Sequence, residues 1–122
     1  DLKGPVAVVE LFLDAVPPPK SAKRARGAFV PEPLQAVTRD FAFVVAAGAS
    51  ADALLRAVRG ADKERIADVA LFDDFAMPDG QRSLALSVTL QPRGASFTDA
   101  DFEGIAKAVT TAAAKAGATL RG

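Results

Sequence analysis

The chain has 122 residues, enough for one compact domain, and half of them are apolar while a quarter are charged, as in ordinary soluble globular proteins. Its 15 basic and 15 acidic side chains cancel, which argues against a strongly basic nucleic-acid clamp but not against a local patch. Cysteine and histidine are absent, which excludes disulfides, thiolate and imidazole metal sites, and mechanisms with a histidine base or a cysteine nucleophile.

Residues 1–16 contain the first predicted element, a strand. Apolar side chains recur there with a period of two, at Ala7, Val9, Leu11 and Leu13. Residues 17–36 read as a linker, because prolines flank a basic stretch. A lone strand cannot bury its apolar face, so residues 1–16 either dock on the following domain or belong to a preceding one. Because the chain starts at Asp1 rather than Met, we expect a piece of a longer protein or a processed product.

The main body, residues 37–122, begins with a strand up to Val45 and a helix between Ser50 and Gly60. Ser50 suits a helix N-cap and Gly60 a helix end. A second strand is predicted over 66–75, followed by turn residues at 78–80.

The second half of this body starts with the clearest pattern in the chain. Four apolar residues alternate with small polar ones along a strand over 83–91, as in a strand with one buried face: Leu84, Leu86, Val88 and Leu90. A capping box from Thr98 to Asp101 starts a helix that ends at Gly117, and residues 118–121 suit a short last strand.

The order β-α-β-β-α-β predicts an α+β, ferredoxin-like fold with an antiparallel sheet, preceded by the separate N-terminal strand and linker. Both helices must cover one face of the sheet, because the strand over 83–91 has only one apolar face. The other face stays open, lined by small residues: Ala42, Ser83, Ala85 and Ser87. A planar ligand could lie against such a surface.

Catalytic, metal and membrane motifs are not found in the sequence. Asp73 and Asp74 are adjacent on a strand and therefore point to opposite faces, so they cannot act as a carboxylate pair. No glycine-rich phosphate loop occurs, and no apolar run reaches the length of a membrane span. We expect a segment that has no catalytic residue, no metal and no cofactor of its own.

Five short motifs in order, RDFAFV (39–44), LFDDF (71–75), GQRSLA (80–85), LQ (90–91) and TD (98–99), carry a resemblance. Residues 37–122 resemble the ferredoxin-fold anticodon-binding domain at the C-terminus of the bacterial phenylalanyl-tRNA synthetase beta subunit. Residues 1–16 resemble, less specifically, the terminal strand of the preceding catalytic-like domain, with 17–36 as the linker.

The resemblance implies a cytoplasmic parent enzyme, a class II aminoacyl-tRNA synthetase with two alpha and two beta subunits. Such an enzyme joins phenylalanine to its tRNA using ATP and magnesium, with catalysis in the alpha subunit. The segment itself would bind the anticodon stem-loop of tRNA(Phe). Carried over by motif, the anticodon-binding residues are Ala42, Asp73, Phe75 and Ser83. The flanking Arg39 and Arg82 would neutralise phosphates.

Other interpretations of these residues stay open. Phe75 stands where the family has tyrosine, and the connection over 76–79 is shorter than in most members. From the residues alone, Asp73 could be merely solvated and Phe75 could belong to the core. The runner-up function is a ferredoxin-like regulatory or interaction module that dimerises through its open sheet face. An acylphosphatase-like activity would need an anion loop that the sequence lacks.

Overall fold

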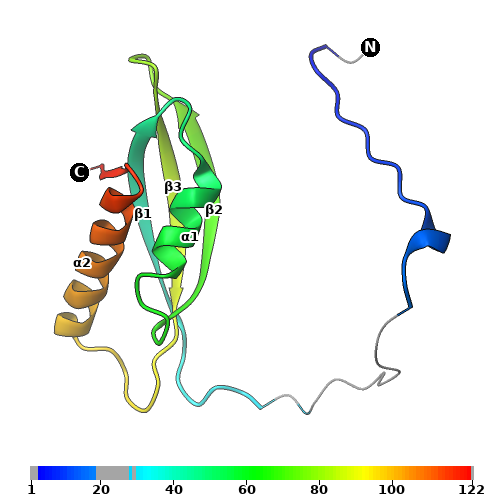
Figure 1. The fold of residues 1–122 in the computed structure, drawn as a ribbon. Helices are drawn as coiled ribbons and strands as arrows, with labels where there is room; N and C mark the ends of the chain where they lie inside the picture. The colour runs from blue at the N-terminus through cyan, green and yellow to red at the C-terminus, as the bar shows by residue number, and fades with distance from the viewer. Residues whose placement is uncertain (1–2, 19–27, 29, 122) are drawn as a thin grey trace. The chain divides into compact units, whose positions relative to one another are not determined.

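The computed structural model describes residues 3–18, 28 and 30–121 (Figure 1). Its contacts divide the chain into two units, Asp1–Pro31 and Glu32–Gly122. Half of the predicted linker, residues 19–27 and 29, lies outside the described residues, as do its basic side chains.

The described residues of the first unit form no β-strand. Residues 3–12 pair with no strand in the described part of the chain, and a short 3₁₀ helix, η1, spans Leu13–Ala15. Val8 and Val9 are 86 and 90% exposed. A strand needs a hydrogen-bonded neighbour, and none of the described residues supplies one, so a strand of a preceding domain over residues 1–16 stays a prediction.

The second unit has the predicted β-α-β-β-α-β order. Its strands lie in the order β2-β3-β1-β4, every neighbouring pair is antiparallel, and both helices cover the same face of the sheet (Figure 1). The ferredoxin-like fold is thus confirmed. The elements are β1 (Val37–Ala46), α1 (Ala51–Arg59), β2 (Ile66–Ala76), β3 (Gln81–Leu90), α2 (Asp99–Lys115) and β4 (Thr119–Leu120).

The core lies between the sheet and the two helices. All four apolar residues of the β3 pattern are buried, as their alternation predicts. On β1, Phe43 and Val45 point into the same layer. The helices contribute residues spaced by four, which lie on one side of each helix: Leu54 and Val58 from α1, and Ile105, Val109 and Ala113 from α2.

The predicted helix caps are confirmed. The Ser50 side chain accepts a hydrogen bond from the Ala53 N–H at the start of α1. At the start of α2, Thr98 and Asp101 form a complete capping box. Phe97 packs against Phe102 across this cap, with ring centroids 5.5 Å apart. These contacts fix where α2 begins and hence its angle of approach to the sheet.

Replacing Thr98 with alanine should lower the free energy of unfolding by about 1 kcal/mol, because the backbone N–H of Asp101 loses its acceptor. The hydrogen bonds from Thr98 also hold the pKa of the Asp101 carboxyl below its usual value. The capping contribution of Asp101 is therefore present near neutral pH and is lost as the pH falls through its lowered pKa in the folded state. Urea unfolding of T98A and wild type at pH 7 and at low pH checks both statements; equal stability at pH 7 would contradict them.

Candidate nucleic-acid interface

The four sequence-predicted site residues come together on the sheet face that the helices leave open. The strand register places Phe75, Ser83 and Val44 side by side in one row across β2, β3 and β1. The next row along the strands contains Asp73, Ala85 and Ala42 in the same order. All four predicted residues therefore share one face and two adjacent rows, a patch that we call the reading face.

A β-bulge in β2 puts Asp73 and Phe75 on this face. Leu71 pairs with Leu86 on the buried side, but the next paired residue is Asp73, opposite Ala85, so Phe72 is extra. In a regular strand Phe72 would lie opposite Ala85, and Asp73 would point toward the helices. The bulge shifts the alternation by one residue, and the carboxylate and the ring at 75 thereby reach the same side.

Phe75 is not a core residue. Its side chain is 55% exposed, whereas the apolar residues that face the helices are buried. Leaving a phenylalanine ring in water on an edge strand gains nothing for folding. The exposure favours a ring that meets a partner outside this chain.

Asp73 is exposed and its carboxylate is oriented by the backbone. One oxygen, Oδ1, accepts the N–H of Asp74 at 3.0 Å. A carboxylate accepts hydrogen bonds through both oxygens, so the second oxygen and the remaining lone pairs stay available. Asp74 itself is turned to the other face, as predicted for adjacent strand residues, and pairs there with Arg82.

Ser83 is buried, and it contacts Arg121, a residue that the sequence analysis did not single out. Only 5% of Ser83 is exposed, although it lies on the open face. The Arg121 guanidinium, through Nη1, donates a hydrogen bond to Ser83 Oγ at 3.3 Å. The backbone N–H of Arg121 donates to the Ala42 carbonyl at 2.8 Å, which extends the β4 pairing by one residue. The sequence did contain a signal for this placement, because in a strand over 118–121 Thr119 and Arg121 lie on the face opposite to that of Leu120.

Arg39 and Arg82 lie on the helix side of the sheet and not on the reading face, and their predicted phosphate contacts stay a prediction. Both alternate in phase with the buried residues and lie on the helix side of the sheet. The Arg39 guanidinium sits 4.5 Å from the Phe102 ring centroid. Arg82 donates to the Ala49 carbonyl at 3.1 Å and forms a two-pronged pair with Asp74, whose pKa this hydrogen bonding lowers. Hydrogen bonds therefore hold the Arg82 guanidinium, whereas the described contact of Arg39 is with the Phe102 ring.

The connection between β2 and β3 is a tight turn at the end of the reading face. Met77 and Gln81 close it through a backbone hydrogen bond of 2.8 Å. Gly80 has a φ of +80°, a conformation that side chains disfavour, so glycine is required there. The short connection over 76–79 therefore places Phe75 next to the β2–β3 turn, at one end of the reading face.

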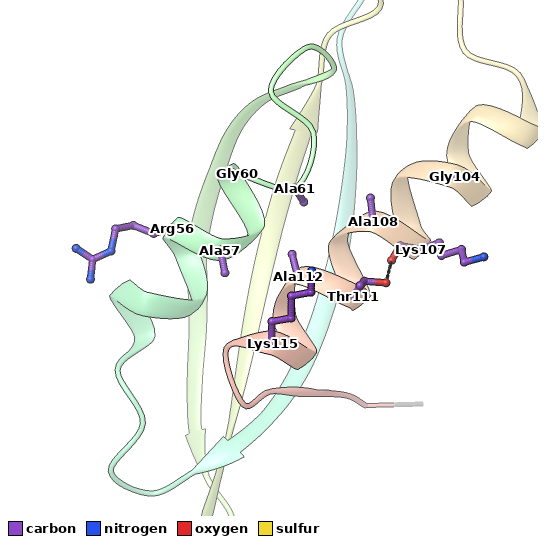
Figure 2. A pocket seen from close by; sticks show the side chains of 10 residues that line it. All are labelled: Arg56, Ala57, Gly60, Ala61, Gly104, Lys107, Ala108, Thr111, Ala112 and Lys115. Carbon is purple, nitrogen blue, oxygen red and sulfur yellow. Dashed lines mark hydrogen bonds between the residues drawn. The ribbon is translucent and has the colours of Figure 1, made fainter.

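A groove on the opposite side of the domain lacks catalytic chemistry. It runs between α1 and α2 and has a volume of about 570 Å³. Figure 2 shows its floor of alanines and glycines, with Arg56, Lys107 and Lys115 at the rim and the Thr111 hydroxyl bonded to the Lys107 carbonyl. No lining residue is a carboxylate. Among the described residues no group of three acidic side chains could hold a metal ion. None of the described helices is long and apolar enough to cross a membrane.

The chain is similar to known proteins along its whole length. The phenylalanine–tRNA ligase beta subunit of Novosphingobium aromaticivorans is 55% identical over 125 aligned residues, which cover 99% of this chain. Those of Paramagnetospirillum magneticum and Zymomonas mobilis are 47 and 42% identical, over 100 and 99% of this chain. The chain spans only 16% of the length of each of these relatives. Residues 33–121 match the ferredoxin-fold anticodon binding domain, and the chain belongs to that family.

Proposed function

We propose that the reading face binds the anticodon stem-loop of tRNA(Phe). The observation that carries this proposal is the exposed Phe75 ring next to the Asp73 carboxylate, beside a floor of two alanines. Proteins recognise single-stranded RNA loops by stacking splayed bases on aromatic rings and by hydrogen bonds to the base edges. The patch offers both kinds of contact within two strand rows.

Each residue of the reading face has a separate role in this proposal. Phe75 stacks on a base, a contact worth about 1–3 kcal/mol in other proteins. Asp73 accepts the two N–H groups on the Watson–Crick edge of guanine, the first base of the GAA anticodon. Ala42 keeps the floor low enough for the base to approach. Ser83 is buried and its oxygen accepts from Arg121, so its contribution to binding runs through the Arg121 side chain.

We further propose that this chain is the arm of a cytoplasmic phenylalanine–tRNA ligase of class II, with two alpha and two beta subunits. The names of its relatives support the ligase and the beta subunit. The step that needs ATP and magnesium would take place in the alpha subunit, as the family resemblance implies. Residues 1–16 would complete a strand of a preceding domain, and the large apolar side chains of residues 3–16 are exposed.

Titration of stem-loops into the 122-residue chain, followed by NMR, tests the RNA-binding proposal. A GAA loop should shift the amide signals of Ala42, Asp73, Phe75 and Ser83, and a scrambled loop of the same length should not. Zero net charge predicts weak binding with a shallow dependence on salt, because few phosphates are contacted. Equal shifts with both loops would contradict the proposal. A dimer that forms with rising concentration and buries Phe75 would favour the interaction module instead.

A further inference from the structure

Arg121 differs from the other arginines of the domain in where its charge lies. Arg39 and Arg82 are held on the helix side of the sheet, and Arg65 pairs with Asp62 and Asp101. Among the described residues that alternate onto the open face, Arg121 alone is cationic.

The guanidinium of Arg121 is anchored but not saturated. It carries five N–H donors, and the one described partner of the side chain is Ser83 Oγ at 3.3 Å. Arg121 is exposed, whereas Ser83, which accepts its hydrogen bond, is buried. The remaining donors therefore face outward at the edge of the reading face. A planar fork of N–H groups in that position matches two oxygens of a phosphodiester.

The charges around the reading face make this position the favourable one for a phosphate. Asp73 and Asp40 lie on the same face, and no ion pair joins either of them among the described residues. Both carboxylates repel an RNA backbone that crosses near them. Suppose that an RNA strand places a base on Phe75 and Asp73 at the β2 edge. Among the described residues of this face, its backbone then finds a positive charge only toward β4, where Arg121 lies.

We propose that Arg121 binds a backbone phosphate of the RNA strand whose base the reading face holds, and that Ser83 positions its guanidinium. This inference rests on the proposed RNA-binding function. Phosphate contacts fix the register of the strand without reading its sequence. Arg121 would thus supply affinity at the β4 edge while Asp73 supplies base preference at the β2 edge.

The test measures the affinity of the 122-residue chain for labelled stem-loops between low and moderate salt. One stem-loop carries GAA, and the other carries adenine in place of the guanine. The variants are R121Q, which removes the charge, and R121K, which keeps it. R56Q is the matched control, because it removes the same charge from α1 on the helix side. NMR signals of the core amides confirm that each variant is folded.

R121Q should weaken both loops to the same extent, by roughly tenfold at low salt, since a charge-assisted contact is lost. Its plot of log affinity against log salt should become shallower by about 0.7, the value for one phosphate contact on a single strand. R121K should keep the wild-type slope, and R56Q should keep both slope and affinity. S83A should weaken binding less than R121Q and leave the slope unchanged.

Three results would overturn the inference. An unchanged slope in R121Q would mean that no phosphate is bound there, and the same holds if R56Q changes the slope equally. Loss of the preference for guanine in R121Q, with the slope retained, would make Arg121 a base-reading residue instead. A wild type that binds both loops equally would overturn the proposed anticodon recognition, which is a separate outcome from any of these.

Discussion

Replacing Phe43 with alanine should lower the free energy of unfolding by about 3–5 kcal/mol. Phe43 is fully buried on β1, which lies inside the sheet between β3 and β4. It pairs with Leu84 on one side and Leu120 on the other, and its ring stacks on Phe41 at a centroid distance of 6.2 Å. Removing the ring leaves a cavity that joins three strands and the helical layer. A loss of this size is a large part of the ~5–15 kcal/mol that holds a typical domain folded.

The matched control is the same substitution at Phe72. That ring belongs to the bulge in β2 and is 59% exposed, so its removal opens no cavity. F72A should change the free energy of unfolding by less than about 1 kcal/mol. Urea unfolding, followed by circular dichroism, measures both variants. Similar losses at the two positions would mean that the burial of Phe43 does not control the stability of the fold.

The fold followed from the sequence wherever a regular period decides burial. The alternation in β3 alone required one apolar face, and hence both helices on that face. The capping box at Thr98 and the glycine after α2 fixed the ends of that helix. Such signals are local, because each depends on residues only a few positions apart in the sequence. The family resemblance then indicated which side of the sheet would meet RNA.

The features that sequence reasoning missed depend on pairing between distant segments. Nothing in residues 71–75 says that Phe72 is the extra residue of a bulge, because a bulge is defined by the partner strand. The alternation with Leu84 already places Arg82 on the helix side, and only its pair with Asp74 depends on the register of β2 and β3. Arg121 reaches Ser83 because β4 lies next to β1, which the sequence separation of 38 residues hides. Residues 3–16 form no strand in the described part of the chain for the same reason, since alternation cannot supply a neighbour.

Replacing Asp73 with asparagine should reduce the preference of the chain for a GAA loop over an AAA loop by about 1–3 kcal/mol, the value of one two-pronged base contact. The carboxylate can accept both N–H groups on the Watson–Crick edge of guanine. Adenine presents one N–H group and a lone pair on that edge, and the lone pair is repelled by the carboxylate. An asparagine side chain has one acceptor oxygen and one donor group, so D73N loses the second acceptor and the charge that favours guanine.

Two further variants separate base reading from other effects. D40N removes the same charge from the same face, on β1 rather than β2, and should leave the preference intact. F75L should weaken both loops by a similar factor, because stacking tolerates any base. Affinities for the two loops, measured for all three variants at one salt concentration, give the comparison. If D73N keeps the preference while F75L abolishes it, the Phe75 ring rather than the Asp73 carboxylate carries the preference for guanine. If D73N loses the preference and F75L keeps it, the one-residue shift at Phe72 is what makes this sheet face selective.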